Sequence, residues 1–327
     1  MTLDLDRLAA TLATALPGQV ERNVALGPLT TWRVGGPAAI RVRIETVADG
    51  VSIARSLPAG VPVAALGRGS NLLVADAGFA GVVLTLGSAF AVVEIGSELV
   101  VAGGATALPV LARRAAAAGR SGLGFFVGIP GSVGGAVRMN AGGHGRETRE
   151  VLRAATVIDL ATDGHVQRRE PASLELGYRH SALGPMEIVV DAEFAVTMGS
   201  PDALRDELAD VVRWRSEHQP GGANAGSVFR NPPGDSAARL IDQACGLRGF
   251  RHGGAVVSEK HANFIQADPH ARAADVWALI ETVRRTVFER TGIALHPEVR
   301  TIGFDAQLAV LDATVPAPHP GLPTRRT

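Results

Sequence analysis

Between Ala39 and Leu160 the chain alternates short β-like runs with glycine, and this rhythm constrains the fold more than any other feature of the sequence. The runs include "AIRVRIETV", "GVVLTL", "LVVAGG" and "AATVIDL". They are rich in Val and Ile and are bounded by turn residues, a pattern typical of half-buried strands. Two helices are predicted between them, one after Thr46 and one that starts at Thr106 as N-cap and ends at Gly119. The region therefore predicts a β-rich domain with few helices.

The sequence pattern changes near residue 199, from short alternating β-like runs to longer helical segments. The segment "SPDALRDELADVVRWRSEH" offers Ser200 as N-cap, Pro201 at the first helical position and acids in the first turn, which predicts the start of a helix. It is followed by a helix around "AARLIDQAC", a strand "GAVVS", a helix from about Ala273 to Arg290 stopped by Gly292, and a strand "PEVRTIG". We expect residues 199–303 to form a second, smaller α+β domain.

The two ends of the 327-residue chain differ from the rest. Residues 1–18 carry acids in the first turn and no long apolar core, so they predict an amphipathic helix ended by Pro17-Gly18 and not a signal peptide. Residues 304–327 include the proline-rich stretch "VPAPHPGLPTRRT" and are expected to be disordered. A chain of this length is expected to hold two or three domains.

Charge and cysteine content exclude several classes of protein. The 32 basic and 32 acidic residues cancel, so no excess positive field is present to bind nucleic acid or an anionic membrane surface. Arg113, Arg114 and Arg120 interrupt the longest apolar stretch, which is too short to span a membrane. The single cysteine, Cys245, excludes an internal disulfide and a multi-cysteine metal site, and the histidines lack the spacing of a helical metal pair. We therefore expect a cytoplasmic protein without a metal, nucleic-acid or membrane partner.

Two glycine-bearing loops, "LGRGSNLLV" (66–74) and "GIPGSVGGAVRMNAGGHG" (128–145), suit a bound pyrophosphate. Glycine lets the backbone approach a ligand closely and turn several amides toward one anion. Neither loop has the full dinucleotide fingerprint, because "GRGSNL" lacks the third glycine and neither loop lies in a clear strand–loop–helix unit. With 39 glycines in the chain, tight turns in a β-rich domain would explain either loop taken alone. That explanation is weaker for both together, since each carries side chains that can hydrogen-bond a bound group: Ser70, Asn71, Ser132 and Asn140.

Beside the stretch "NAGSVFRNP" (224–232), which holds Ser227, three further segments carry polar side chains: "GYRHS" (177–181), "SEKHANF" (258–264) and "HPEVR" (296–300). Arg179 can hold a carboxylate or an enolate-like dianion through two parallel hydrogen bonds, Glu298 is a candidate acid, and a serine beside either can donate a proton. The alternatives are a solvated Arg or Glu at a strand edge and a Ser-Gly turn. A Ser-His-Asp hydrolase is not indicated, because "NAGSVF" does not supply the G-x-S-x-G elbow.

Seven motifs between residues 30 and 302 resemble the UDP-N-acetylenolpyruvoylglucosamine reductase (MurB) family in their order and spacing. They are "TTWRVGGPA", "GRGSNLLV", "GIPGSVGGAVRMNAG", "YRHS", "NAGSVFRNP", "LIDQACGLRGFRHGGAVVSEKHANFI" and "HPEVR". The resemblance implies an α+β fold with an FAD-binding domain of the vanillyl-alcohol-oxidase (PCMH) type over residues 19–198. That domain is expected to consist of two α+β subdomains divided near residues 96–100, and to precede a substrate-binding domain over residues 199–303.

The resemblance also implies a non-covalent FAD whose pyrophosphate is held by the two glycine loops, with NADPH as the co-substrate that reduces it. The first loop would belong to the first subdomain and the second loop to the second. The loop residues expected to bind the cofactor are Gly67, Arg68, Gly69, Ser70, Asn71, Gly131, Ser132, Gly134, Gly135, Asn140 and Ala141.

The reaction implied by the resemblance reduces UDP-N-acetylglucosamine enolpyruvate to UDP-N-acetylmuramate, a cytosolic step of peptidoglycan synthesis. NADPH reduces FAD and leaves, and the sugar nucleotide then enters the same cleft. Hydride passes from flavin N5 to C3 of the enolpyruvyl group, and Ser227 donates the proton to C2. Arg179 and Glu298 match the family's other two catalytic residues and would stabilise the enolate. We expect Glu298 to be neutral in the complex, since an ionised carboxylate would repel that of the substrate.

The chain departs from the family pattern at several positions. It has a single tyrosine, Tyr178, and so is similar to the branch that lacks an inserted loop with a tyrosine over the uridine phosphates. Arg248 stands where relatives often have lysine, and we expect it to bind the substrate together with Tyr178 and Asn231. His218 lies near the position of a missing lysine, and His144 stands where an aromatic residue often follows "NAG".

Two other functions compete with this one. A flavin-dependent oxidase or dehydrogenase of the same superfamily would act on an alcohol or hydroxy acid with a dedicated base, and often with a flavin linked through His or Cys, neither of which we can assign. A non-enzymatic nucleotide-binding protein would leave Arg179, Ser227 and Glu298 unexplained. We expect the reductase, acting as a monomer.

Overall fold

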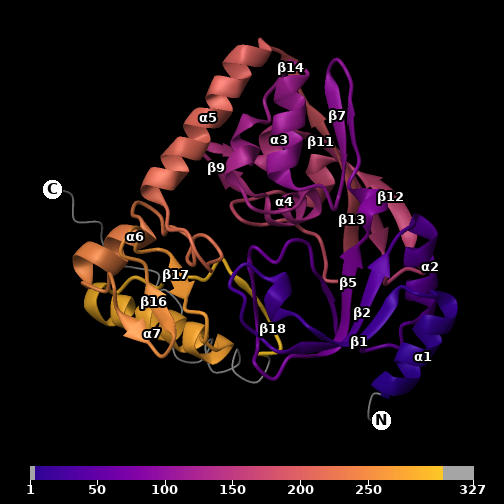
Figure 1. Ribbon diagram of the computed structural model, residues 1–327, viewed down its shortest axis with the longest axis horizontal. Helices are drawn as coiled ribbons and strands as arrows, with labels where there is room; N and C mark the ends of the chain where they lie inside the picture. Colours follow the sequence, from indigo (N-terminus) through magenta and orange to yellow (C-terminus); the bar gives the residue numbers. More distant parts are fainter. Residues whose placement is uncertain (1–3, 305–327) are drawn as a thin grey trace.

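The computed structural model describes residues 4–304, which form two sheet-bearing subdomains and a C-terminal domain (Figure 1). Helices and strands are mixed along the chain and the sheets are predominantly antiparallel, in agreement with the α+β fold expected from the sequence. Of the tail expected to be disordered, only Phe304 is described, and it is buried beside Trp277. Residues 305–327 lie outside the described residues.

The first subdomain is a four-stranded sheet in the order β1-β2-β5-β3, with two helices packed on it. Every second residue of β2 is buried, as the alternating sequence predicts. The helix expected after Thr46 is confirmed: the Thr46 hydroxyl accepts the Asp49 N–H, and the Asp49 carboxylate accepts the Thr46 N–H. The elements are α1 (Leu5–Ala15), β1 (Val20–Ala25), β2 (Pro37–Ile44), α2 (Val47–Ser56), β3 (Val63–Ala65) and β5 (Phe79–Leu86).

The second subdomain is a five-stranded antiparallel sheet in the order β12-β11-β13-β7-β6. Because β6 and β7 pair with each other, the chain has already changed sheets at residue 93, before the expected 96–100. The expectation of Thr106 as N-cap is wrong: Ala107 is the N-cap, and the buried Thr106 hydroxyl donates to the Val92 carbonyl instead. The elements are β6 (Val93–Ile95), β7 (Leu99–Gly103), α3 (Leu108–Ala117), β11 (Leu152–Asp159), β12 (His165–Arg169) and β13 (Glu187–Ala195).

A short helix, α4 (Val133–Met139), lies inside the second glycine loop, where the sequence did not predict one. The Ser132 hydroxyl caps it by accepting the Gly135 N–H at 3.4 Å. A Cβ atom at Gly134 would lie 3.1 Å from the carbonyl oxygen of Val189 in β13. The glycines lower the helix propensity but let α4 pack closely on the second sheet.

The long helix α5 (Pro201–His218) begins where the sequence predicts, with Ser200 at the N-cap. Its buried Leu204 and Leu208 are part of the hydrophobic core of the second subdomain. By packing, α5 therefore belongs with that subdomain, although it follows the expected boundary near residue 199. Figure 1 shows the helix running from the second subdomain toward the C-terminal domain.

The C-terminal domain combines α7 (Ala273–Thr291) with the three-stranded sheet β15-β16-β17. The predicted stop of α7 is confirmed, since Gly292 adopts a left-handed φ of 72°. The last strand, β18 (Arg300–Ile302), pairs in parallel with β4 (Leu72–Val74) of the first subdomain. The other elements are α6 (Ala237–Arg239) with its π-helical extension Leu240–Ala244, β15 (Arg251–His252), β16 (Ala255–Val257) and β17 (Ile265–Ala267).

The first subdomain and the C-terminal domain share one hydrophobic core. Trp32 is buried among the side chains of the C-terminal domain, and its indole N–H donates to the Ile265 carbonyl at 2.8 Å. The carboxylate of Asp76 accepts the N–H groups of Ala273 and Ala274, at 2.9 and 3.0 Å, and so caps α7. These contacts fix the C-terminal domain against the first subdomain.

Candidate active site

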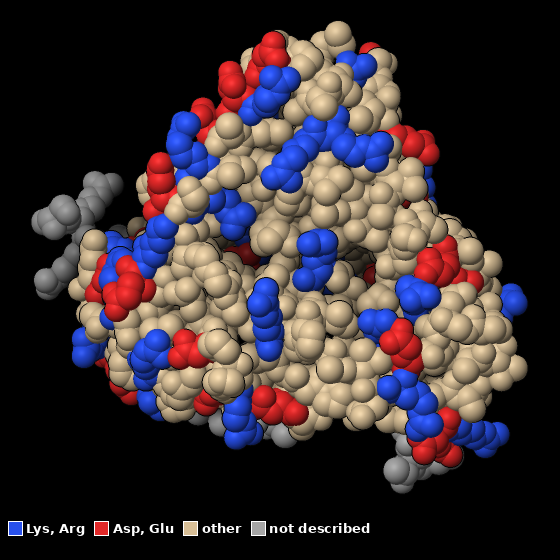
Figure 2. Space-filling model, in the orientation of Figure 1, with Lys and Arg blue, Asp and Glu red and all other residues tan. Residues whose placement is uncertain are grey.

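A cleft of about 1150 Å³ lies where the two subdomains and the C-terminal domain meet. Its walls include parts of both glycine loops, of the segment 225–227 and of the segment 298–302. The space-filling view shows this face hollowed near its centre, with basic side chains beside the hollow (Figure 2). The predicted site residues that line the cleft are Gly67, Arg68, Gly69, Ser70, Asn71, Gly131, Ser132, Gly135, Ala141, Arg179, Ser227 and Glu298.

The two glycine loops approach each other so closely that side chains are excluded between them. A Cβ atom at Gly67 would lie 2.5 Å from the Ser132 hydroxyl oxygen. Gly69, with a φ of 61°, packs on a different segment, since a Cβ atom there would lie 2.3 Å from the Leu29 carbonyl oxygen. The loops therefore form a backbone cradle at the cleft wall, of the kind that accepts a phosphate or pyrophosphate group.

Two residues that were expected to bind the cofactor do not line the cleft. Gly134 packs α4 against the second sheet. Asn140 is fully buried, and its side-chain amide donates to the Glu147 carboxylate at 3.0 Å and to the Gly177 carbonyl at 2.8 Å. Its side-chain oxygen accepts the Arg149 N–H at 2.9 Å. The amide of Asn140 is thus satisfied by the protein, which gives it a role in holding neighbouring segments.

Ser227 and Glu298 come together because three segments of the C-terminal domain lie side by side. The Val228 N–H donates to the Asn263 carbonyl at 2.8 Å, and the Glu298 N–H donates to the Val228 carbonyl at 2.8 Å. The buried Asn263 side chain bonds both the N–H and the carbonyl of Phe229, at 2.9 and 2.8 Å. Sequence analysis missed Asn263, although it lies within the matching motif "SEKHANF".

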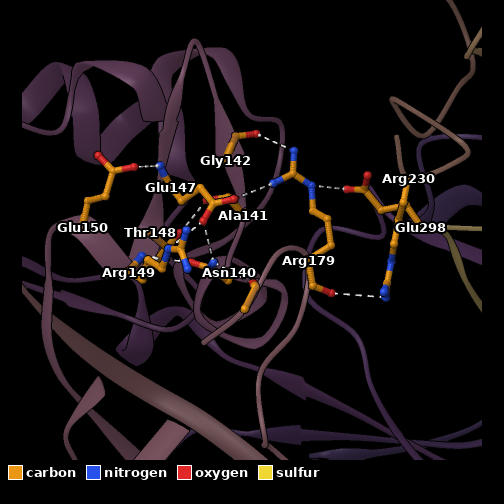
Figure 3. A network of polar contacts seen from close by, with 11 residues as sticks. Asn140, Ala141, Gly142, Glu147, Thr148, Arg149, Glu150, Arg179, Arg230 and Glu298 are labelled. Atoms are coloured by element: carbon orange, nitrogen blue, oxygen red, sulfur yellow. Dashed lines mark hydrogen bonds and ion pairs between the residues drawn. The ribbon is translucent and has the colours of Figure 1, made fainter. Parts of the chain in front are cut away.

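Arg179 reaches the same place from the second subdomain. It lies in a tight turn in which Gly177 and His180 exchange both backbone hydrogen bonds at 3.1 Å, and its own φ is 55°. Its Nε lies 2.7 Å from Glu298 Oε1, so the ion pair joins the second subdomain to the C-terminal domain (Figure 3). A left-handed arginine in a closed turn is strained, and the strain is maintained by the surrounding contacts.

Burial raises the pKa of Glu298 above its ordinary value, and this effect outweighs the lowering by Arg179 and Arg230. Arg230, which sequence analysis missed, lies within "SVFRNP" and donates from Nη2 to the Arg179 carbonyl at 3.4 Å. Burial and repulsion from neighbouring guanidinium groups lower the pKa values of Arg138 and Arg300. The charged side chains that line the cleft are Arg68, Arg138, Arg179, Arg215, Arg300, Asp163 and Glu298, a balance that favours anionic ligands.

The three residues expected to bind the substrate lie outside the cleft wall. The Asn231 side-chain oxygen accepts the Ala237 N–H at 3.0 Å and so begins α6. Arg248 pairs with Asp242 and donates to a backbone carbonyl. Tyr178 is 45% exposed beside the guanidinium group of Arg179, which lies 5.0 Å from the ring centre. Their assignment to the substrate stays a prediction.

The two histidines that depart from the family pattern both contact Trp214 of α5. The ring of His218 stacks on Trp214 at 4.6 Å, and the ring of His144 meets Trp214 edge to face at 5.0 Å. His144 has a φ of 52° at the tip of the hairpin β9–β10, and burial lowers its pKa. The stack attaches the hairpin to α5. The hairpin strands are β9 (Gly142–Gly143) and β10 (Arg146–Glu147).

Two kinds of feature are absent from the part of the chain that the structure describes, residues 4–304. No helix there is long and apolar enough to cross a membrane. No group of three or more His, Cys, Asp or Glu side chains there is arranged to hold a metal ion.

Comparison with known proteins identifies the family. Residues 218–302 match the C-terminal domain of UDP-N-acetylenolpyruvoylglucosamine reductase, and residues 38–169 match an FAD binding domain. A UDP-N-acetylenolpyruvoylglucosamine reductase of Acidiphilium cryptum is 47% identical over 89% of this chain and 94% of its own length. The chain belongs to the UDP-N-acetylenolpyruvoylglucosamine reductase family. A member from Caulobacter vibrioides is 43% identical over 90% of this chain and 99% of its own length.

A solved structure of the family has the same fold. The crystal structure of the reductase from Thermus caldophilus superimposes with a TM-score of 0.75 at 39% identity, covering 87% of this chain and 99% of that one. The expected FAD-binding architecture and the expected family are therefore both confirmed. The cradle formed around Gly67, Gly69 and Ser132 fits the pyrophosphate of FAD, because it offers backbone groups where no side chain would fit.

Proposed function

We propose that this chain reduces UDP-N-acetylglucosamine enolpyruvate to UDP-N-acetylmuramate with FAD and NADPH, as a cytoplasmic step of peptidoglycan precursor synthesis that serves cell shape and division. The observation that carries the proposal is the Arg179–Glu298 pair, at 2.7 Å, in one cleft with Ser227 and with the glycine cradle. The alternative of an alcohol or hydroxy-acid oxidase is not favoured, because relatives that match nearly the whole chain carry the name of the reductase.

Each side chain of the trio has a separate task in this proposal. When bound, FAD supplies the hydride that is added to C3 of the enolpyruvyl group. Ser227 gives its hydroxyl proton to C2, which has become basic enough to accept it. Arg179 stabilises the negative charge that develops on the substrate carboxylate as the enolate forms. Glu298, with its raised pKa, acts as a neutral acid that donates a hydrogen bond where an ionised carboxylate would repel.

The glycine loops and the arginines of the cleft would hold the cofactor and orient the sugar nucleotide. Gly67, Gly69 and Gly131 would leave backbone groups open to the pyrophosphate. Arg138 and Arg300 add positive charge to the same wall. The phosphates of the nucleotide thereby meet local groups in a chain with no net charge.

The test separates the two half-reactions under anaerobic conditions. The flavin of the purified protein is reduced with NADPH, UDP-N-acetylglucosamine enolpyruvate is added, and the return of the oxidised absorbance band is followed. We expect prompt reoxidation in the wild type and a loss of about a thousandfold or more in Ser227→Ala, with reduction by NADPH unchanged. A flavin that stays reduced until oxygen is admitted would support the oxidase, and a protein that binds no flavin would overturn the proposal.

The same reoxidation measured against pH tests Glu298. Because burial raises its pKa, the neutral form persists to higher pH than that of an exposed carboxyl group, and the rate should fall as pH rises through this pKa. Glu298→Gln cannot ionise, so it should retain activity near the wild-type level and lose this fall at high pH. Abolished activity in Glu298→Gln would show that the ionised form is needed.

A further inference from the structure

A β-hairpin supports Arg179 from the side opposite to Glu298 (Figure 3). The guanidinium group meets three acceptors through three different nitrogens. Its Nε lies 2.7 Å from Glu298, its Nη2 donates to the Gly142 carbonyl at 3.2 Å, and its Nη1 lies 4.0 Å from Glu147 Oε1. Gly142 and Glu147 belong to the paired strands β9 and β10. Two of the three contacts therefore come from one hairpin.

Glu147 is itself held in a defined orientation. Its Oε2 accepts the Asn140 side-chain amide at 3.0 Å and lies 2.8 Å from Arg149 Nε. Its backbone N–H donates to Glu150 Oε1 at 2.8 Å. The Glu147 side chain is only 17% exposed and does not line the cleft. With Oε2 bound in this way, Oε1 is left facing Arg179.

Asn140 connects this carboxylate to the backbone that carries Arg179. The same amide nitrogen that donates to Glu147 also donates to the carbonyl of Gly177, which opens the turn of Arg179. Asn140 is fully buried and left-handed, with a φ of 41° at the end of α4. One buried side chain thus fixes both the anion behind Arg179 and the main chain before it.

We propose that Glu147, oriented by Asn140, is a positioning residue that keeps Arg179 in its catalytic orientation when Glu298 is neutral and the substrate carboxylate arrives. The inference rests on the proposed function, because it concerns the same reaction. Glu298 and the substrate share the cleft side of Arg179, so their occupancy and charge change during turnover. Glu147 lies behind it, outside the cleft wall, and is unaffected by that exchange. A long arginine side chain needs such fixed partners to retain one orientation.

The charge of Glu147 also bears on Glu298. The charged groups that face Glu298 are Arg179 and Arg230, with Arg300 two residues further along the chain. Arg179 and Arg230 both favour the ionised form of Glu298. The negative charge of Glu147, on the other side of Arg179, partly offsets the charge of Arg179. Removing the charge of Glu147 should therefore lower the pKa of Glu298.

The deciding comparison is Glu147→Gln with Glu150→Gln in the complete, FAD-loaded protein. Each variant removes one negative charge from the same turn and keeps a side-chain oxygen as acceptor, but only Glu147 faces Arg179. For Glu147→Gln we expect substrate-dependent reoxidation to slow about 10- to 100-fold, and its fall at high pH to move to lower pH. Reduction by NADPH and the flavin spectrum should be unchanged. Glu150→Gln retains an oxygen to accept the Glu147 N–H and should match the wild type. Glu147→Asp, which retains the charge, should recover part of the rate.

The possible outcomes separate this inference from the proposed function. A Glu147→Gln variant with wild-type rate and pH profile overturns the inference, and so does a slowed variant whose pH profile stays in place, since that marks a merely structural role. If UDP-N-acetylglucosamine enolpyruvate does not reoxidise the reduced flavin of the wild type, the proposed function fails whatever Glu147 does. Should Glu147→Gln lose its flavin, Glu147→Asp decides: a flavin-loaded Glu147→Asp that is slowed about 100-fold or more, although it retains the charge, counts against the proposal.

Discussion

The C-terminal domain meets the two subdomains through contacts of opposite character. Toward the first subdomain the contact is apolar, with Trp32 and Leu73 buried in a shared core and β18 paired to β4. Toward the second subdomain it rests on polar groups, the Arg179–Glu298 pair and a hydrogen bond from Lys260 to the Ser216 carbonyl. Within residues 4–304, none of the buried apolar clusters joins the second subdomain to the C-terminal domain.

The difference shows which of the two contacts depends on apolar burial. Separating the apolar contact would expose buried side chains to water, which is costly in proportion to their area. Separating the polar contact exchanges protein partners for water, which costs little for the exposed Lys260 but more for the largely buried Arg179 and Glu298. The trio of Arg179, Ser227 and Glu298 is therefore assembled across the contact that lacks a shared apolar core.

Among the substitutions at these contacts, replacing Trp32 should lower the free energy of unfolding most. Trp32→Ala removes a buried ring and its hydrogen bond to Ile265, so we expect it to lower the free energy of unfolding by about 3–5 kcal/mol. Denaturant unfolding followed by circular dichroism measures the change. Trp32→Phe, which keeps most of the ring but leaves the Ile265 carbonyl without its donor, should cost less, about 1–3 kcal/mol. Equal losses in the two variants would mean that packing contributes little to this contact.

Replacing Asp76 should have an intermediate effect on the free energy of unfolding. Asp76 belongs to the first subdomain and caps α7 of the C-terminal domain. Asp76→Ala leaves the first N–H groups of α7 without their acceptor, and we expect a loss of about 0.5–2 kcal/mol in the same unfolding experiment. Asp76→Asn retains a side-chain oxygen and serves as the matched control, with a smaller loss expected. A neutral Asp76→Ala would indicate that water replaces the cap fully.

The smallest change in the free energy of unfolding is expected for a substitution in the polar contact. Lys260→Met keeps the length of an exposed side chain and removes its hydrogen bond to Ser216, so the free energy of unfolding should change by less than about 0.5 kcal/mol. The measurement is again denaturant unfolding, with the exposed Arg251→Met on the same domain as control. A loss comparable with that of Trp32→Ala would contradict the contrast between the two contacts.

The sequence predicted those parts of the site whose chemistry is local. Glycine loops, strand alternation and the helix start at Ser200 depend on neighbouring residues, and the structure has them in place. The resemblance then named Arg179, Ser227 and Glu298, which the structure brings to one cleft. Their mutual distance could not be deduced from spacing, because Arg179 and Glu298 are over a hundred residues apart in the chain.

What the sequence did not predict depends on long-range packing. Helix α4 forms in a glycine-rich segment because close packing on the second sheet compensates for poor propensity. Asn140 has a side-chain amide that could bind a ligand, but in the folded protein this amide is hydrogen-bonded to Glu147 and Gly177. The importance of Glu147 arises from the turn of the hairpin and has no signature in the residue types around it.

The pairing of β18 with β4 also has a kinetic consequence. The hydrogen bond from the Asn71 side chain to the Glu298 carbonyl spans 227 residues, and that from Trp32 to Ile265 spans 233. Contacts of such high sequence separation form late and slowly, since a long loop must close before they are made. During synthesis the first subdomain must therefore wait, with Trp32 uncovered, until nearly the whole chain has left the ribosome.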